Sequence, residues 1–378
     1  MDGGQRGRPP SGPSLLPDEL LCEIFTRLSA TTLSKIRCVS KSWLSIISSQ
    51  EFVKSHFKKW DNDDEFTHHS IIAKYINPHL HVKQCSVYSL LKNPATPAAR
   101  IDYPGENPPH SASVVGSCNG LICILLDEQD LYLWNPCTRQ SRKLSDPGFT
   151  GNSRSFNFYG FGYNESNNDY NVVLGSISSV ERKIEVVIYS LKTDSWRMID
   201  NFPTCLPWLE TGAFVSGKLH WAVSSCVCDC DARIVSLDLV RLEYGEVQLP
   251  GCVEDASVLT LGVSGKCLCV SILYCYQPNV YSIWKKNVGL WVMMEYGVVE
   301  SWIKVASVWP YHAPLCISAK GEILLTSSSD FGLYNLGDES MRYPRIEDVD
   351  DVYLEGHIYV ESLVSPFADE ERVHDQQR

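Results

Sequence analysis

The chain has 378 residues, of which 44% are hydrophobic, and its formal net charge at pH 7 is −12. This length suits two unequal domains with a sizeable core, and the acidity argues against nucleic acid as a ligand. The first 60 residues carry nine Lys and Arg against five Asp and Glu, so they are net +4 while the remainder is −16. A basic N-terminal part favours an acidic protein partner.

Neither a secretory signal nor a membrane span is expected. Residues 1–13 are polar and proline-rich where a signal peptide would have an apolar segment. The most apolar long window, 258–276, has Lys266 near its centre together with two glycines, which argues against a transmembrane helix. Fifteen cysteines without a secretory signal indicate reduced thiols, and therefore a cytoplasmic or nuclear protein.

Residues 14–60 predict three short helices. Pro17 suits a first helical position, and an apolar face with helical spacing follows it. A second apolar face runs from Leu33 to Ile47, and a third helix carries Phe52 to Trp60. So short a unit has little core of its own. Its apolar faces either pack on the rest of the chain or dock on another protein by helix-in-groove recognition.

The stretch "LPDELLCEIFTRL…TLSKIRCVSKSW" resembles an F-box, the motif that binds the Skp adaptor of Skp–cullin–F-box ubiquitin ligases. It departs from many plant members at Ser29–Thr32, where those members often have a proline. The resemblance implies that the adaptor-binding residues are Leu16, Pro17, Leu20, Ile24, Leu28, Leu33, Ile36, Arg37, Val39, Ser40, Lys41 and Trp43. Among these, Arg37 and Lys41 are expected to pair with adaptor acids at the rim of the interface.

Beyond residue 66, short apolar runs alternate with Gly, Asn, Asp and Pro turns, a pattern typical of an all-β domain. Six units of strand, polar turn and strand recur with centres 42 to 55 residues apart, near Tyr88, Trp134, Tyr189, Leu237, Val292 and Tyr334. This period predicts a six-bladed β-propeller closed by a strand within 357–366, with a two-sheet β-sandwich as the alternative. Tryptophans 134, 196, 221, 291 and 302 fall inside the repeats and are expected to pack between strands.

The fold class is therefore α+β and multidomain, a three-helix F-box followed by an all-β domain. The boundaries expected are a disordered N-terminus (1–13), the F-box (14–60), an acidic linker with the start of the β domain (61–84), the β domain (85–366) and a disordered tail (367–378).

The pentapeptide GSCNG at 116–120 has the form of a nucleophile elbow with Cys118 as the nucleophile. An elbow opens a helix, whereas this stretch is followed at once by the apolar β-branched run LICILL. Asn119-Gly120 between two apolar runs is a strong hairpin signal, because both residues tolerate positive φ. The sequence therefore predicts a turn.

Segments from about 85 to 308, among them "SCNGLICI…LYLWNPCTRQSRKL" and "GAFVSGKLHWAV", are similar to the plant F-box-associated, kelch-related domain. Together with the F-box, this resemblance implies a non-catalytic substrate-recognition subunit of a ubiquitin ligase. Its expected partners are the Skp adaptor, a cullin reached through that adaptor, and a target protein bound by the β domain. No cofactor, nucleic acid or membrane partner is implied.

Other candidate sites are weaker. Cys226, Cys228 and Cys230 alternate but lack a fourth metal ligand, and the histidines at 56, 68, 69, 79 and 81 cluster only loosely, so no metal is expected. Trp208, in a proline-flanked loop, is the candidate for target contact. Specificity is expected in the loops 145–158, 203–212 and 225–233.

Two other classes of protein remain open. A propeller enzyme with a helical cap would need converging carboxylates, histidines or a metal at the propeller centre. A plain scaffold would use the N-terminal helices only as a brace, so that removing residues 1–60 would destabilise the β domain. A receptor with separate domains is expected to keep its β domain folded without them.

Overall fold

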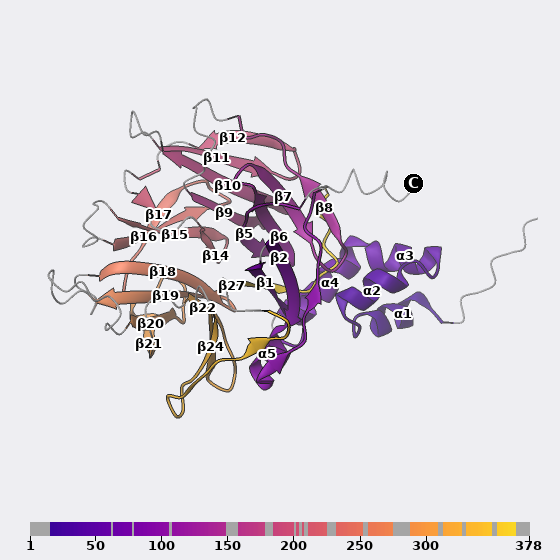
Figure 1. Cartoon of the computed structure of the whole chain (residues 1–378). Coiled ribbons are helices and arrows are strands. Elements are labelled where there is room, and N and C mark those ends of the chain that lie inside the picture. The colour runs from indigo at the N-terminus through magenta and orange to yellow at the C-terminus, as the bar shows by residue number, and fades with distance from the viewer. Residues whose placement is uncertain are drawn as a thin grey trace, which may run out of the picture.

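The computed structural model combines a small helical bundle with a β-propeller, and the bundle lies against one end of the propeller (Figure 1). No helix of the described residues is long and apolar enough to cross a membrane. The described residues are 16–61, 63–77, 79–105, 108–148, 158–177, 184–199, 202–203, 206–207, 211–224, 232–251, 256–274, 288–308, 313–326, 330–349 and 354–367.

The N-terminal bundle has four helices, so the prediction of three was wrong. They are α1 (Asp18–Phe25), α2 (Ala30–Ile36), α3 (Lys41–Ser48) and α4 (Gln50–Asp61). The apolar face expected to form one helix from Leu33 to Ile47 is broken at Ser40, whose backbone is extended. The Ser40 hydroxyl accepts a hydrogen bond from the Trp43 amide at 3.2 Å and so caps α3.

The β domain is a six-bladed propeller, which confirms the predicted architecture and excludes the sandwich. Each blade is an antiparallel sheet, and the blades follow one another around a central axis. Blade 2 comprises β5 (Ala112–Cys118), β6 (Leu121–Leu126), β7 (Asp130–Asn135) and β8 (Gln140–Lys143). Blade 3 comprises β9 (Phe158–Asn164), β10 (Asp169–Ile177), β11 (Ile184–Ser190) and β12 (Ser195–Ile199). Blade 4 comprises β13 (Leu206–Pro207), β14 (Ala213–Val215), β15 (Lys218–Ser224), β16 (Ala232–Asp238) and β17 (Tyr244–Val247).

Blades 5 and 6 continue this pattern, and one short parallel pair links blade 6 to blade 1. Blade 5 comprises β18 (Ala256–Ser264), β19 (Cys267–Tyr274), β20 (Val288–Met293) and β21 (Trp302–Val308), with the 3-10 turn η2 (Val299–Ser301) before β21. Blade 6 comprises β22 (Ala313–Ile317), β23 (Glu322–Thr326), β24 (Phe331–Asn335) and β25 (Met341–Arg342). The parallel pair is β26 (Arg345–Ile346) with β3 (Ala95–Thr96).

Blade 1 is assembled from both ends of the β domain and closes the ring. Its strands are β1 (His69–Asn77), β2 (His79–Ser86), β4 (Ala99–Arg100) and the C-terminal β27 (Leu354–Val360), in the order β27-β1-β2-β4. Ile71 on β1 pairs with Ile358 on β27. The predicted closing strand is confirmed, although it begins three residues earlier than expected.

The first predicted repeat unit, around Tyr88, was wrong. Residues 87–92 form helix α5 (Val87–Lys92), capped by Ser86, whose hydroxyl accepts from the Ser89 amide at 3.3 Å. Strands β1 and β2 occupy 69–86, within the segment expected to hold the acidic linker and the start of the β domain. The other five units include the two outer strands of blades 2 to 6.

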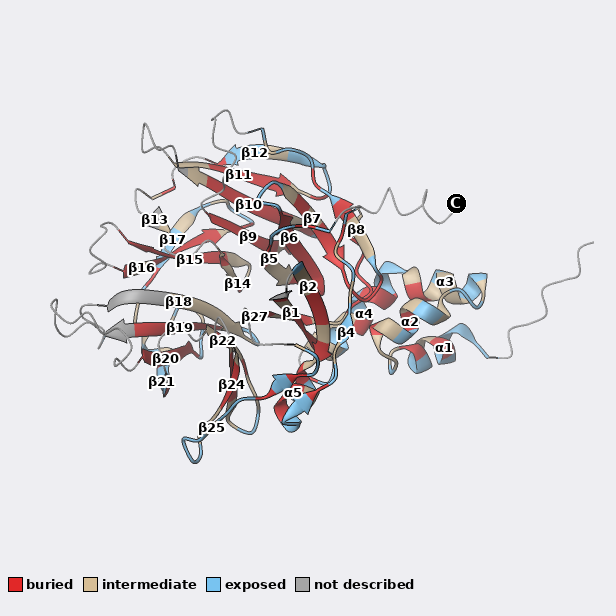
Figure 2. Cartoon of the chain, in the orientation of Figure 1, coloured by how far each residue is buried: buried red, intermediate tan, exposed pale blue. Residues whose placement is uncertain are grey.

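One hydrophobic core runs from the helical bundle into the propeller. Leu21, Phe25 and Leu33 belong to the same cluster of buried side chains as Leu133 of β7 and Tyr359 of β27. Figure 2 shows buried residues extending from the helices into the neighbouring strands. The tryptophans at 134, 221, 291 and 302 are buried, and Trp196 is half-buried, as expected of residues that pack between strands.

Polar contacts fix which end of the propeller meets the helices. The Lys54 ammonium of α4 donates to the Asn168 side chain in the β9–β10 turn at 3.3 Å. The Ser34 hydroxyl of α2 contacts the Cys137 carbonyl in the β7–β8 turn. The helices therefore lie on the end of the propeller that carries the turns between first and second strands and between third and fourth strands.

Candidate functional site

Helix α1 presents an apolar surface that no part of the described chain covers. Leu16, Leu20 and Ile24 expose 41%, 46% and 47% of their surface, whereas Leu21 and Phe25 on the other face are buried. Leu20 and Ile24 are four residues apart and so lie above one another on the same face. An exposed apolar row on a short helix is suited to helix-in-groove binding.

Val39, which is 64% exposed, adds a second apolar position to this surface between α2 and α3. We call Leu16, Leu20, Ile24 and Val39 the helical docking surface. Pro17 and Lys41 are also exposed, while Arg37 and Ser40 are half-buried. Arg37 lies two residues before Val39 and Lys41 two residues after it, so positive charge borders this surface.

Four of the predicted adaptor-binding residues support this surface from inside. Leu33 is fully buried, so its side chain has no surface to offer a partner. Leu28, Ile36 and Trp43 are half-buried and pack against the core. The Trp43 ring meets Phe25 edge-on, with ring centroids 4.9 Å apart, and thereby sets the orientation of α1. Helical spacing alone could not separate these inward positions from the outward ones.

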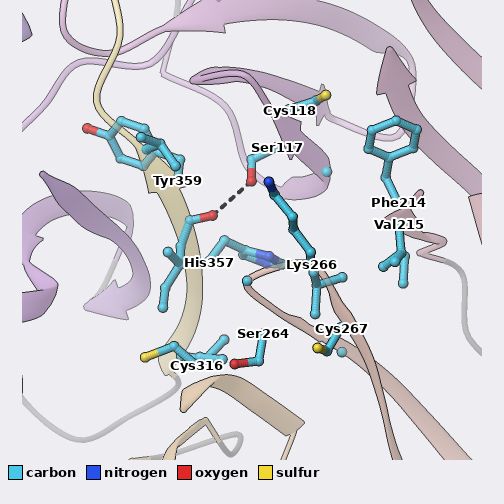
Figure 3. Close-up of a pocket in the computed structure, with 18 of the residues that line it drawn as sticks. Ser117, Cys118, Phe214, Val215, Ser264, Lys266, Cys267, Cys316, His357 and Tyr359 are labelled. Atoms are coloured by element: carbon cyan, nitrogen blue, oxygen red, sulfur yellow. Dashed lines mark hydrogen bonds between the residues drawn. The ribbon is translucent and has the colours of Figure 1, made fainter. Parts of the chain in front are cut away.

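The second candidate site is the central channel of the propeller. It has a volume of about 2020 Å³ and is lined by the inner strands β5, β9, β14, β18, β22 and β27. Asp61 at the end of α4, with Asp63 and Asp64, borders the mouth on the helical side. Figure 3 shows Ser117, Lys266 and His357, from three different blades, around the channel.

A charged cluster lies in the half of the channel farther from the helices. The Glu355 carboxylate forms an ion pair with Lys74 and accepts a hydrogen bond from His357 Nε2 at 2.9 Å. These partners outweigh its burial and lower the pKa of Glu355 to about 2. Sequence reasoning missed this cluster, because Lys74 and Glu355 are 281 positions apart and meet only through ring closure.

The GSCNG segment is a hairpin, as predicted. β5 ends at Cys118 and β6 begins at Leu121, with Asn119 at φ 51° and Gly120 at φ 80° between them. Cys118 is buried, and burial raises the pKa of its thiol well above the ordinary value. The thiol is therefore protonated at neutral pH and is not an activated nucleophile.

The histidines near the junction between helices and propeller are structural. His56 Nε2 lies 2.8 Å from the Leu28 carbonyl, and the His68 ring packs on Trp60 with centroids 3.6 Å apart. Burial lowers the pKa of His56 and His68, and lowers that of His69 to about 4. Among the described residues, no group of three or more His, Cys, Asp or Glu has an arrangement that could hold a metal ion.

Several predicted features lie outside the described residues. These are Trp208, the cysteines 226–230, most of the loops 145–158, 203–212 and 225–233, and the two termini, 1–13 and 368–378. The strand ends that flank one of the loops, Ser224 and Ala232, lie at the end of the propeller opposite the helices, because β15 starts at the helical end.

The comparisons with known proteins agree with this architecture. Residues 13–55 match the F-box domain, and residues 48–365 match the F-box associated beta propeller domain. The chain therefore belongs to the F-box proteins that carry an F-box-associated β-propeller.

Among its relatives in Arabidopsis thaliana, F-box/kelch-repeat protein At3g23880 is 31% identical over 94% of this chain and 96% of its own. F-box protein CPR1 is 27% identical over 92% of this chain and 88% of its own. Among solved structures, TolB from Acinetobacter baumannii is similar with a TM-score of 0.50 and 9% identity, over 78% of this chain and 67% of its own. That likeness concerns the fold alone.

Proposed function

We propose that this protein is the substrate-recognition subunit of a Skp–cullin–F-box ubiquitin ligase. The helical docking surface binds the Skp adaptor, and through it a cullin, while the propeller binds the target protein. Transfer of ubiquitin takes place elsewhere in the assembly, and the chain itself is not catalytic. Its contribution is to raise the effective concentration of target lysines near the activated ubiquitin. A reducing compartment, cytoplasm or nucleus, suits its unpaired thiols.

The observation that carries this proposal is the exposed apolar row on α1. Leu20 and Ile24 each leave nearly half of their surface in solvent, although the same helix buries Leu21 and Phe25. Complete burial of a leucine contributes about 1.5 to 3 kcal/mol, so covering the remaining exposed part of Leu16, Leu20 and Ile24 supplies on the order of 1 kcal/mol for each. Lys41 and Arg37 at its border favour an acidic partner and accelerate association with it.

Target binding is proposed for the end of the propeller opposite the helices. The helices cover part of the other end, where Ser34 and Lys54 contact the turns of blades 2 and 3. A target bound at the far end does not compete with the adaptor for space. Because helices and propeller share one core, the adaptor and the target are held in a fixed relative position.

Co-expression of the full chain with a plant Skp adaptor, followed by size-exclusion chromatography, tests adaptor binding. The native chain is expected to form a stoichiometric complex, and Leu20→Asp combined with Ile24→Asp is expected to lose it while the circular dichroism spectrum stays unchanged. Met198→Asp is the matched control, because Met198 is 60% exposed on β12, away from the helices. Failure of the folded native chain to bind any of several adaptors would refute the proposal.

A further inference from the structure

Ser40 lies in the connector between α2 and α3, next to the helical docking surface. Its backbone is extended, with φ −153° and ψ 159°, and its neighbours Val39 and Lys41 are both exposed. Ser40 itself is half-buried, and its hydroxyl lies 3.0 Å from that of the exposed Ser42. The connector therefore offers a serine hydroxyl to a modifying enzyme in a stretch of chain that belongs to no helix.

Positive charge surrounds this serine in the sequence. Arg37 lies three positions before it, Lys35 five positions before it, and Lys41 directly after it. Lys35 and Lys41 are exposed, and none of the three side chains forms an ion pair with a carboxylate of the described residues. Serine kinases that select basic segments recognise such side chains by charge pairing. The connector therefore has the composition of a substrate for a kinase of this kind.

A phosphate on Ser40 cancels the charge that borders the helical docking surface. Arg37 and Lys41 together contribute two positive charges there. A phosphoserine adds about −1.5 to −2 charges at pH 7. The phosphate is also strongly hydrated, so a partner that covers the neighbouring Val39 must remove part of this hydration at a cost in free energy. Both effects oppose the binding of an acidic adaptor, and the first also slows its association.

We propose that Ser40 is a phosphorylation site and that its modification releases the protein from the adaptor. A kinase that selects basic segments transfers the terminal phosphate of ATP to Ser40. The serine oxygen forms the new bond to phosphorus, the bond from that phosphorus to the bridging oxygen of ATP breaks, and ADP and the hydroxyl proton leave. This inference rests on the proposed function, because it regulates the same docking surface.

Phosphate transfer is tested on the full chain with ATP and the catalytic subunit of cyclic-AMP-dependent protein kinase, which selects arginine before a serine. Mass spectrometry of the digested product is expected to find phosphate on Ser40. Arg37→Gln should reduce its incorporation by at least about tenfold, because the charge pairing with the kinase is lost. Arg197→Gln is the matched control, since Arg197 is exposed on β12, away from the F-box. Absence of phosphate on Ser40 of the folded chain overturns the proposal.

The effect on docking is measured by isothermal titration of a plant Skp adaptor with full chains that differ only at position 40. Phosphoserine incorporated there during translation is expected to weaken binding by at least about tenfold relative to serine. Ser40→Asp should bind more weakly than Ser40→Asn. Asp and Asn both replace the serine as the cap of α3, so the two variants should unfold at the same temperature and their difference isolates the charge.

The two proposals fail in different ways. If the unmodified chain binds no adaptor, the proposed function is refuted, and the regulatory role of Ser40 with it. If the unmodified chain binds and the phosphoserine chain binds as tightly, the proposed function stands and only the regulatory role is overturned.

Discussion

The hydroxyl of Ser34 in the F-box lies 3.0 Å from the main-chain carbonyl oxygen of Cys137 in the second propeller blade. This contact lies within a continuous core, because Leu33 next to Ser34 is in the same buried cluster as Cys137. The F-box is thus part of the propeller's fold as well as the proposed docking module. One face of α1 packs on this core, and the opposite face carries the proposed docking surface.

Removal of residues 1–60 is therefore expected to destabilise the propeller, which reverses the expectation from sequence that a receptor's β domain stays folded without these helices. The deletion removes Leu21, Phe25 and Leu33 from the core cluster that they share with the propeller, and it removes the contact of Ser34 with the Cys137 turn. The truncated chain should unfold at a lower temperature than the full chain and bind more of a dye specific for exposed apolar surface. Thermal unfolding of both chains measures this, and equal midpoints would contradict the shared core.

Substitutions at two leucines of the F-box are expected to distinguish effects on stability from effects on adaptor binding. Leu33 is fully buried, so Leu33→Ala is expected to reduce the free energy of unfolding by about 2 to 5 kcal/mol. Leu20 is 46% exposed, so Leu20→Ala should change stability by less than about 0.5 kcal/mol while weakening adaptor binding. Denaturant unfolding and adaptor titration on both variants check this. Equal losses of stability would contradict the assignment of the two faces.

Gly120 in the GSCNG hairpin is expected to tolerate no side chain. A Cβ there would lie 2.1 Å from the Ser362 hydroxyl and 2.6 Å from the Val360 carbonyl, in a backbone at φ +80°. Gly217 has a similar φ of +75° but no atom within 4 Å of its Cβ position. Gly217→Ala should therefore cost only the backbone strain, about 1 kcal/mol.

Gly120→Ala should cost more than about 2 kcal/mol, because strain and steric overlap add. The difference between the two variants in denaturant unfolding isolates the overlap with the C-terminal segment. Identical losses would mean that this segment does not pack against the hairpin.

Acidification is expected to loosen the junction between F-box and propeller. Burial lowers the pKa of His69 to about 4, and lowers those of His56 and His68, whereas an unfolded histidine titrates near 6.5. The unfolded chain therefore binds more protons than the folded chain in this range. The stabilisation is fully present above about pH 6.5 and is lost as the pH falls toward 4. For His69 alone, the loss of stability between neutral pH and about pH 4 is on the order of 3 kcal/mol.

Unfolding midpoints measured between about pH 7.5 and pH 4.5 test this dependence. The neighbours of His69 also affect its pKa, because Asp63 raises it and His68 lowers it. The test variant therefore changes His69 alone. His69→Gln should flatten the dependence in this range. His110→Gln is the control, because His110 is almost fully exposed. A native chain whose stability does not change over this range would refute the prediction.

Much of the fold could be predicted from the sequence, because it is a repeat. Alternating apolar residues around turns such as Asn119-Gly120 recur at a blade's spacing and predict strands wherever they occur. The break at Ser40 was missed because apolar residues continue at helical spacing on both sides of it. α5 was missed because a short apolar run such as VYSLL does not distinguish helix from strand.

The docking surface and the channel differ in how far sequence predicts them. The F-box residues are close in sequence, so their pattern was recognisable, although it did not separate buried Leu33 from exposed Leu20. Lys74, Lys266 and Glu355 come from three distant parts of the chain and share one channel only because the ring closes. No local pattern carries that information.

Ring closure by β27 has a consequence for the synthesis of the protein. Because β1 lacks its inner neighbour until Leu354–Val360 has been translated, blade 1 stays incomplete while nearly all of the chain leaves the ribosome. The F-box helices, made first, must wait for the same event, since Tyr359 and Leu363 belong to the core on which they pack. A chain that ends at a premature stop codon before β27 thus has an F-box sequence but lacks part of the propeller core on which the F-box helices pack. Packing of the F-box helices is thus linked to completion of the last strand of the propeller.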